Sequence, residues 1–502
     1  MPRAGRRRVR RGARHRVGGH RALPRARDRG DHGRRDLDRG RGLPGKLGAG
    51  RARAPRRAGG RADVDVLSRT LCATLFALAA SGCVFSDRCV NGAARDEASG
   101  RCTLTVDPDA GESDAGSGAD AGDASTDDDA GVPRRIAQVS VGVVHACAID
   151  DLGVLRCWGD NSSGALATGD TAASSVPRVI DLGAAVTQVG GTALHTCATT
   201  SAPATFCWGQ NAEGQIGDGT PGDIPTTTPF EITGLGALQQ IMGGFANTCA
   251  VSLLGQAVCW GRNDRNQLGN RHIEMTQPVP GAPMVEPDGS ELEGARQVAI
   301  ADRHICLRVD GRAYCVGDGG EGSLGDDTRL DRPEPVPVST LTDVTDVAAS
   351  FAHSCAVAGG EVFCWGDGTQ GQVVPEMTDS YAGPQLVVFP IAAREVVTGE
   401  KHSCALLEDG TVHCWGTDDD GALGDAASHT GPTAPVQVEG LSGVTALEAN
   451  FVGVTCALTG AGELFCWGQD SIELLGGPRP GGTSIFLDGM TRHDTPVRVD
   501  PL

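Results

Sequence analysis

The sequence has 502 residues and a formal net charge of −19, and its charges are unevenly distributed. Residues 1–62 hold 22 of the 44 basic residues but only 4 of the 63 acidic ones, which leaves 22 basic against 59 acidic residues, a net charge of −37, for the rest of the chain. A surface this acidic repels phosphate backbones, which argues against nucleic acid as a partner.

Two segments at the start of the chain precede any globular pattern. Residues 1–62 are rich in Arg, Gly, Ala and Pro without an apolar period, and we interpret them as a non-native or disordered basic extension. Residues 63–83 contain Arg69, an apolar run of ten residues that begins at Leu71, and small residues before Cys83, which is the pattern of an export signal. The run is too short to span a bilayer as a mature helix.

The end of this signal, Ala80-Ser81-Gly82-Cys83, resembles the lipobox of bacterial lipoproteins. In that family the cysteine is acylated and becomes the mature N-terminus, so the resemblance implies lipidation of Cys83. The next residue, Val84, is not the Asp that commonly keeps such proteins at the inner membrane, which implies the outer membrane. The alternative is an ordinary cleaved signal with an incidental cysteine, which would give a secreted protein.

Residues 84–106 and 107–133 separate the signal from the rest of the chain. In the first segment, Cys89 and Cys102 flank a short polar stretch, and we expect them to close a small disulfide loop. The second segment is a low-complexity sequence of Asp, Ala, Gly and Ser, which cannot bury a core and whose charges repel one another. It predicts an extended, disordered, acidic stalk.

Residues 134–502 repeat one unit seven times, with 49 to 57 residues between successive first cysteines. Many glycines and short Val, Ala and Leu runs without a helical period predict an all-β array. All six tryptophans directly follow a second cysteine: they are Trp158, Trp208, Trp260, Trp365, Trp415 and Trp467. The cysteine pairs are Cys147 and Cys157, Cys197 and Cys207, Cys249 and Cys259, Cys306 and Cys315, Cys355 and Cys364, Cys404 and Cys414, and Cys456 and Cys466.

The residues between paired cysteines predict that these pairs are disulfides. Where the spacing is nine, opposing the cysteines leaves Asp310-Gly311 or Gly359-Gly360 as a two-residue hairpin turn, and both dipeptides tolerate positive φ. Where the spacing is ten, the loop has three residues and ends in glycine in four of five repeats, as a bulged hairpin requires. The cysteines then face each other within disulfide reach, in a chain exported to where disulfides persist.

Five repeats have a histidine two residues before the first cysteine, which raises the alternative of a metal site. A zinc site needs four ligands, or three and a water molecule. Each repeat offers at most three, and the third and seventh repeats have Asn247 and Val454 at the histidine position. We therefore expect no metal, and we expect each histidine to be hydrogen-bonded to backbone. The five are His145, His195, His304, His353 and His402.

The tryptophans are expected to be structural. Strand alternation places Trp158 on the opposite sheet face from the preceding cysteine and across the hairpin from Ala146. The fourth repeat has Val316 in place of tryptophan, and there the small partners become Ile305 and Leu307. The larger side chains on one strand thus compensate for the smaller side chain on the other, as close packing requires.

Four short antiparallel strands per unit, seven times over, predict a seven-bladed β-propeller. Each unit has a Pro-Val strand and a VxxV strand before its hairpin, as in SVPRVIDLGAAVTQVGG. The first unit lacks its Pro-Val strand, and the chain ends with a spare one in TPVRVDPL. We therefore expect the C-terminal strand, at about residues 496–499, to complete the first blade and close the ring.

The stretches GEKHSCALLEDGTVHCWGTDDDGALGD and CWGQNAEGQIGDG resemble the repeat of the regulator of chromosome condensation family. The resemblance covers roughly residues 134–502 and implies a seven-bladed propeller, but one fold hosts unrelated functions. The founder of that family is a nuclear guanine-nucleotide exchange factor, whose GTPase an exported propeller would not meet.

No nucleophile motif or phosphate-binding glycine loop stands out from the repeats. Sialidase propellers need a tyrosine nucleophile and an arginine cluster, whereas Tyr314 and Tyr381 are the only tyrosines here. We therefore predict a monomeric, non-enzymatic platform without a cofactor, tethered to the cell envelope, that engages a protein or glycan through its blade loops. The alternatives are an exported inhibitor of a cell-envelope enzyme, as one secreted propeller of this family is, and a guanine-nucleotide exchange factor by family analogy.

Overall fold

The computed structural model describes residues 94–95, 102–103, 134–191, 193–418, 421–427, 431, 433–470 and 491–499. The chain divides into two units, Met1–Gly122 and Asp123–Leu502. In the first unit the described residues are β1 (Ala94–Arg95) and β2 (Cys102–Thr103), which pair antiparallel. The segments 1–62, 63–83 and 107–133, and with them Cys83 and Cys89, lie outside the described residues, so their interpretation stays a prediction.

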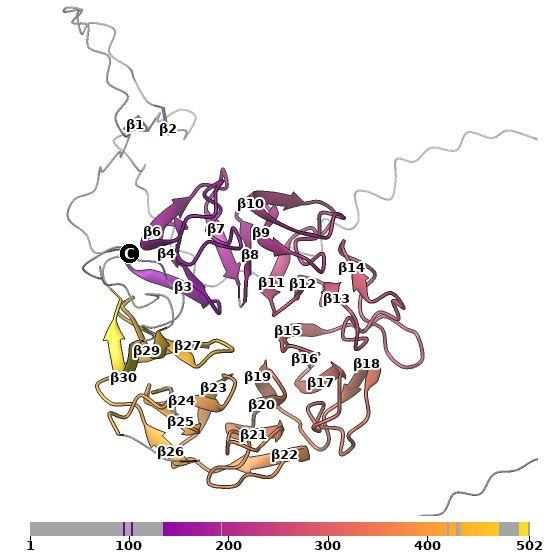
Figure 1. Ribbon diagram of the computed structural model, residues 1–502, viewed down its shortest axis with the longest axis vertical. Helices are drawn as coiled ribbons and strands as arrows, with labels where there is room; N and C mark the ends of the chain where they lie inside the picture. Colours follow the sequence, from indigo (N-terminus) through magenta and orange to yellow (C-terminus); the bar gives the residue numbers. More distant parts are fainter. Residues whose placement is uncertain are drawn as a thin grey trace, which may run out of the picture. The chain divides into compact units, whose positions relative to one another are not determined.

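The second unit is a ring of seven four-stranded antiparallel sheets (Figure 1), as the sequence predicts. In the part of the chain that the structure describes there is no helix, and so none long and apolar enough to cross a membrane. The blades are β3 (Ile136–Val141), β4 (His145–Asp150), β5 (Leu155–Gly159) and β6 (Ser174–Ile180); β7 (Val186–Gly190), β8 (His195–Thr200), β9 (Thr205–Asn211) and β10 (Gly222–Ile232); β11 (Leu238–Gly243), β12 (Asn247–Ser252), β13 (Ala257–Arg262) and β14 (Thr276–Gln277); β15 (Ala295–Ile300), β16 (His304–Val309), β17 (Arg312–Gly317) and β18 (Arg332–Pro337); β19 (Val344–Ser350), β20 (His353–Ala358), β21 (Glu361–Gly366) and β22 (Tyr381–Val387); β23 (Ala393–Thr398), β24 (His402–Leu407), β25 (Val412–Gly416) and β26 (Thr433–Gln437); and β27 (Val444–Ala449), β28 (Val454–Thr459), β29 (Leu464–Asp470) and β30 (Thr491–Arg498).

The position of each strand within a blade, from the inner to the outer edge, agrees with its residue composition. The VxxV strand comes first and lies nearest the axis, the two cysteine strands follow, and the Pro-Val strand forms the outer edge (Figure 1). The cysteine strands are buried almost throughout, because they have a strand on either side and a neighbouring blade on each face. Proline suits the outer edge because no further strand needs its missing N–H group.

The prediction that the C-terminal strand completes the first blade is wrong. β30 pairs with β29 of the seventh blade, and the first blade takes its outer strand, β6, from its own stretch of chain. The Pro-Val strand ends a unit instead of starting one, so that no strand is left over. The ring closes by packing and by hydrogen bonds instead: Val499 shares a buried cluster with Ile136 of the first blade, and Asn450 donates to the carbonyl of Gly142 at 2.8 Å.

A disulfide joins the two central strands of every blade, at each of the seven predicted pairs. The paired cysteines are direct cross-strand neighbours, with Cα atoms 4.0 to 4.1 Å apart. The two-residue turns have the expected backbone, since φ is 46° and 74° at Asp310 and Gly311 and 60° and 83° at Gly359 and Gly360. Turn length and cysteine spacing therefore change together, as the hairpin argument requires. The predicted pair of Cys102 with Cys89 stays a prediction.

Candidate functional site

The five histidines that precede the first cysteines lie between adjacent blades. His353 is fully buried, and its Nε2 atom lies 3.0 Å from the Oγ atom of Ser403 in the next blade. The expectation of a backbone partner is therefore wrong, because each histidine contacts a hydroxyl group of the next blade. The other four pairs are His145 with Thr196 (2.7 Å), His195 with Thr248 (2.8 Å), His304 with Ser354 (2.7 Å) and His402 with Thr455 (2.8 Å).

The hydroxyl group and the tryptophan of one blade share a carbonyl of the preceding blade. Ser403 Oγ donates to the carbonyl oxygen of Gln372 at 3.0 Å, and Trp415 Nε1 donates to the same oxygen at 3.0 Å. Because the hydroxyl proton is used there, the Ser403 oxygen accepts the Nε2 proton of His353. We call the histidine, the hydroxyl, the indole and the shared carbonyl the interblade clasp.

The six tryptophans are at most 1 % exposed. Trp158 lies opposite Ala146 across its hairpin, in the register that strand alternation predicts. The indole groups tie blades together rather than line a surface, and the remaining bonds of this kind run from Trp208 to the carbonyl of Ala165 (2.7 Å), Trp260 to Gln215 (2.9 Å), Trp365 to Ser323 (2.9 Å) and Trp467 to Ala422 (2.9 Å).

Two of the seven interfaces lack the clasp, and each has lost both partners together. Asn247 replaces the histidine in the third blade, and Ile305 replaces the hydroxyl residue in the fourth. Val454 and Ala146 do the same between the seventh and first blades. A buried histidine facing a blade without a hydroxyl would lack a hydrogen bond, at a cost of about 1–3 kcal/mol, so the two losses occur as a pair.

The interface between the third and fourth blades is apolar instead. Ile305, Leu307 and Val316 are fully buried in one cluster. The same cluster contains Met284, which comes from the longer segment between β14 and β15. The volume of the missing tryptophan is thus filled both from the facing strand, as the sequence suggested, and from the preceding blade.

Burial lowers the pKa of every clasp histidine, to about 4 for His145, His304 and His402 and to about 3 for His195 and His353. The rings therefore stay neutral over the physiological range. Within the described ranges, no group of three or more His, Cys, Asp or Glu side chains is arranged to hold a metal ion. The histidines and cysteines that the sequence offered as candidate chemistry serve the scaffold.

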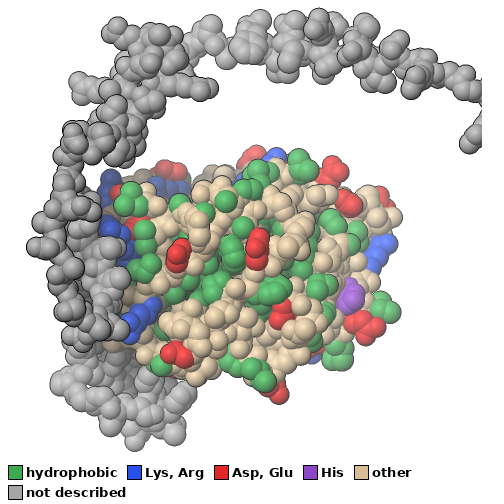
Figure 2. All heavy atoms as spheres, turned by 90° about the horizontal axis from the view of Figure 1, so that it is seen from above, with side chains coloured by type: hydrophobic (Ala, Val, Ile, Leu, Met, Phe, Trp, Pro, Cys, Tyr) green, Lys and Arg blue, Asp and Glu red, His purple; other side chains and the backbone are tan. Residues whose placement is uncertain are grey.

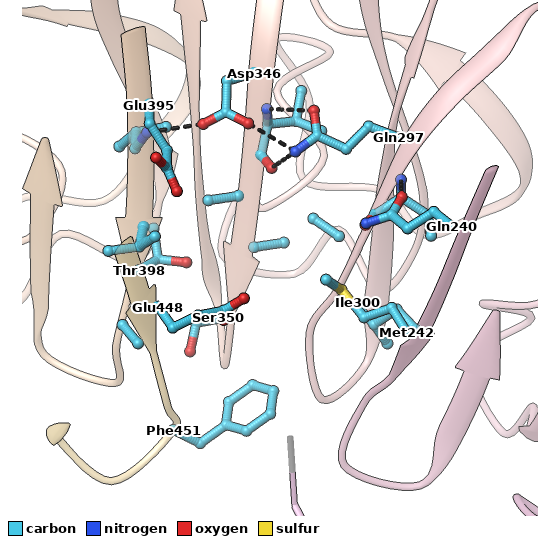
Figure 3. A pocket seen from close by; sticks show the side chains of 18 residues that line it. Gln240, Met242, Gln297, Ile300, Asp346, Ser350, Glu395, Thr398, Glu448 and Phe451 are labelled. Atoms are coloured by element: carbon cyan, nitrogen blue, oxygen red, sulfur yellow. Dashed lines mark hydrogen bonds between the residues drawn. The ribbon is translucent and has the colours of Figure 1, made fainter. Parts of the chain in front are cut away.

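The central channel holds polar groups of a different kind (Figure 3). A cavity of about 190 Å³ is lined by residues of β11, β15, β19, β23 and β27 and by Phe451. Three carboxyl groups line it, from Asp346, Glu395 and Glu448, together with apolar side chains such as Met242. None of the described residues around the cavity is Lys, Arg or His.

Side chains at the channel link each inner strand to the next blade. The amide of Gln240 donates to the carbonyl of Val298 at 3.2 Å and accepts from its N–H at 2.7 Å. Gln138 and Gln297 each make the same pair of bonds to one residue of the next blade. Gln188 donates to the carbonyl of Gln239 and accepts the N–H of Ile241. We call the residues at this position the inner ring.

The inner ring changes from amides to carboxyl groups in the fifth and sixth blades. Asp346 accepts the N–H of Val396 at 2.7 Å, and Glu395 accepts the N–H of Leu447 at 3.0 Å. An ionised carboxylate accepts hydrogen bonds but cannot donate to the neighbouring carbonyl as glutamine does, whereas a protonated carboxyl group can. Protonation therefore lets Glu395 bond as the glutamines do, whereas the second oxygen of Asp346 accepts from the amide of Gln297 at 2.7 Å.

Burial raises the pKa of all three channel carboxyl groups. The pKa of Asp346 rises to about 6, although the positive charge of Arg308 opposes the shift. Burial and the charge of Asp346 raise the pKa of Glu395 to about 8, against the charge of Arg394. Burial and both other carboxylates raise the pKa of Glu448 to about 8, and no cation opposes that shift. A positive charge placed in the cavity would favour the ionised forms.

The two ends of the cavity differ. At one end Phe451 meets Phe245 of the third blade edge to face, with ring centroids 6.4 Å apart. Asp346 and Glu395 lie at the other end, and Glu448 lies between (Figure 3).

A network of ion pairs joins the loops of the third and fourth blades. Arg265 lies 3.6 Å from Asp318, Arg262 lies 3.0 Å from Asp302, and Arg303 contacts both of these aspartates. The loops that follow β13 and β17 also carry exposed apolar side chains: Ile273 is 90 % exposed, and Met275 and Leu330 are exposed as well. We call these eight residues the loop surface. On the side of the ring seen in Figure 2, by contrast, acidic side chains stand singly among hydrophobic and uncharged ones.

Models of the family "Regulator of chromosome condensation (RCC1) repeat" match residues 136–165, 310–357, 344–372 and 393–422. The ultraviolet-B receptor UVR8 of Arabidopsis thaliana is 26 % identical over 372 residues, which are 70 % of this chain and 81 % of UVR8. The E3 ubiquitin-protein ligase HERC2 of Homo sapiens is 28 % identical over 252 residues, which are 47 % of this chain and only 5 % of HERC2. The structure of Prp20p from Saccharomyces cerevisiae matches with a TM-score of 0.58 at 20 % identity, over 74 % of this chain and 86 % of that one.

The protein is therefore a seven-bladed β-propeller, and four segments of it match models of the RCC1 repeat. The likeness to Prp20p shows the fold alone at this identity, and the match to HERC2 spans a small part of that ligase. The matched models describe a structural repeat and indicate no enzymatic family.

Sequence reasoning did not single out the inner ring or Glu448. A signal was present, because the third position of the inner strand is glutamine in the first four repeats and then becomes Asp346 and Glu395. A carboxyl residue at a position that is glutamine in the first four repeats departs from the pattern that stabilises the scaffold, and such departures are expected at functional sites. Glu448 carries no such signal, since its repeat position varies freely between small and large residues.

The fourth blade should not tolerate restoration of the tryptophan alone. We expect Val316→Trp to cost about 1–3 kcal/mol, because the indole meets Ile305 and Leu307 in a filled site. Adding Ile305→Thr and Leu307→Ala should recover much of this loss, since other blades combine tryptophan with these smaller partners. Denaturant unfolding of the single and triple variants measures both effects. A harmless single substitution would show that position 316 is not a packed site.

The shifted pKa values predict maximal stability near pH 6.5. The five histidines have folded pKa values below the unfolded value, so their contribution is complete above pH 6.5 and is lost as the pH falls toward 4. The three carboxyl groups have raised pKa values, so theirs is complete below about pH 4 and is lost as the pH rises through 6 and then 8. Below pH 6.5 the five histidines outweigh the three carboxyl groups, so stability rises with pH. Above pH 6.5 only the two glutamates titrate, so stability falls.

Calorimetric melting between pH 4 and pH 9 checks this maximum. Glu395→Gln should raise the melting temperature at pH 8 and leave it nearly unchanged at pH 4.5, because an amide restores both inner-ring bonds without a proton. Each glutamate accounts for at most about 1.4 kcal/mol per pH unit between pH 6.5 and 8. A melting temperature that keeps rising up to pH 8 would contradict the assignment.

Proposed function

We propose that this protein is a non-enzymatic binding platform that engages a partner protein through the loop surface of its third and fourth blades. The observation that carries the proposal is the exposure of Ile273, at 90 %, in loops that also hold an arginine–aspartate network. Arginine, methionine and exposed apolar groups together are typical of protein interfaces. A rigid ring that presents variable loops suits recognition, since binding residues concentrate on loops held by a scaffold.

The relatives support a binding role. UVR8 is named a receptor, and the report of the Prp20p structure concerns its binding to Gsp1p and histones. Inhibition of a cell-envelope enzyme would be one form of such binding. Guanine-nucleotide exchange is the alternative by analogy with the family, and a glycan partner is an outcome that the same experiment distinguishes.

We further propose that the platform is tethered to the cell envelope through Cys83. The lipobox resemblance supports the anchor, and the acidic segment 107–133 supports a spacer that holds the ring away from the membrane. At about 5–6 Å × √n, some thirty residues give a mean reach of roughly 30 Å.

Crosslinking pull-down with the intact protein tests the loop surface. We expect a specific partner from cell-envelope or secreted fractions, and Ile273→Asp should reduce its capture by about tenfold or more, as for a central interface residue. The matched control is Ile224→Asp, because Ile224 is 87 % exposed but lies in the second blade. Equal loss in both variants, turnover of a substrate by the ring, or nucleotide exchange on a GTPase would contradict the proposal.

Detergent-phase partitioning tests the tether. The intact protein should enter the detergent phase, and Cys83→Ser should move it to the aqueous phase because the acylated thiol is lost. Cys89→Ser serves as a control for a cysteine that is not at the lipobox. An aqueous wild-type protein would favour the secreted form.

A further inference from the structure

The central cavity combines acidic and apolar walls in a volume suited to a small group. Its 190 Å³ corresponds to about six water molecules at the liquid volume of roughly 30 Å³ each. Met242, Ile300 and Val397 line it alongside the carboxyl groups. A short alkyl chain with a polar head matches both the size and this mixed lining.

Glu448 is the carboxyl group with the least compensation. Asp346 and Glu395 each accept a backbone N–H and feel a nearby arginine, Arg308 or Arg394. The charges acting on Glu448 among the described residues are the other two carboxylates, both negative. A carboxylate in an enclosed, partly apolar site is ordinarily paired with a cation, and a cation is what this half-buried position lacks.

Ser350 provides an independent observation in the same wall. It lines the cavity at the end of β19, is 2 % exposed, and its hydroxyl oxygen has no hydrogen-bond partner among the described residues. Buried polar groups nearly always have a partner, so this hydroxyl points to a missing ligand. The ring of Phe451 closes the same end and can face a cation or pack against an alkyl stem.

We propose that the central cavity binds an alkylammonium group, with Glu448 as its counterion and the Ser350 hydroxyl as a hydrogen-bond acceptor. The apolar lining, which includes Met242, Ile300 and Val397, surrounds the alkyl stem. A free amine and the lysine side chain of a partner share this chemistry. The site is separate from the loop surface, so either proposal can fail without the other.

Titration calorimetry of the intact protein at pH 9 tests the site with three probes and with n-butanol as an uncharged control. The first is n-butylammonium chloride, the second is the peptide Gly-Ser-Lys-Ser-Gly, and the third is the same peptide with norleucine in place of lysine. Binding of butylammonium and of the lysine peptide alone supports a partner side chain as the source. Binding of butylammonium alone supports a free amine. Failure of butylammonium to bind, or equal binding of uncharged n-butanol, overturns the proposal.

The pH dependence provides a second readout. At pH 6 the ammonium group must displace a proton from Glu448. We therefore expect its affinity at pH 6 to be at most about one tenth of its affinity at pH 9. Proton release, measured in buffers of different ionisation enthalpy, should accompany binding near pH 7.5. An affinity independent of pH would overturn the role of Glu448.

Variants separate ligand binding from folding. Glu448→Gln should weaken butylammonium binding by about tenfold or more, the effect of losing a charged hydrogen-bond partner. The same variant should melt at a higher temperature at pH 8, because a buried repulsive charge is removed, so lost binding cannot be ascribed to unfolding. Ser350→Ala should weaken binding severalfold. The matched control, Glu439→Gln, changes an exposed glutamate outside the cavity and should bind as wild type. Unchanged affinity in Glu448→Gln would overturn the proposal.

Discussion

The interblade clasp is the contact that joins five of the seven pairs of adjacent blades. A hydroxyl group and an indole N–H from one blade converge on a single carbonyl oxygen of the preceding blade, and the hydroxyl in turn accepts from a buried histidine of that blade. Sheets that pack face to face share no β-ladder, so adjacent blades are joined by apolar packing, by single backbone bonds such as that from Val186 N–H to the carbonyl of Gly153, and by side-chain contacts. The clasp adds direction to that packing, and it fixes the height at which each blade meets the next.

The clasp also explains why the histidine and the hydroxyl residue are replaced together in neighbouring repeats, a pattern that is not visible within one repeat. Asn247 and Ile305 lie in different repeats, as do Val454 and Ala146, yet each pair forms one interface. A repeat protein is nearly one-dimensional, with contacts between neighbours only, so the unit that must stay consistent is the interface rather than the repeat. At the interface between the third and fourth blades the contacting side chains are apolar, and Met284 fills the remaining space.

Much of the fold could be predicted because its rules are local. Cysteine spacing and turn residues such as Asp310-Gly311 fix the central hairpin, and seven such hairpins fix the blade count. The partner of the histidines and the blade to which the C-terminal strand belongs could not be predicted in the same way. Both depend on which neighbouring element a strand meets, and a single repeat contains that information only when it is compared with the next one. The channel carboxyl groups required the same comparison around the axis.

The carboxyl residues of the central channel make the scaffold less stable than amides would. Glutamine at the inner ring satisfies both backbone groups of the next blade at every pH, and four blades use it. Asp346 and Glu395 satisfy only the N–H group when ionised, and Glu448 adds a third negative charge without a donor. Three carboxyl groups confined to adjacent inner strands repel one another, so a chain selected for stability alone would favour amides here. Positions that break the rule of their own repeat at a cost in stability are where function is expected, and in this ring they gather around one cavity.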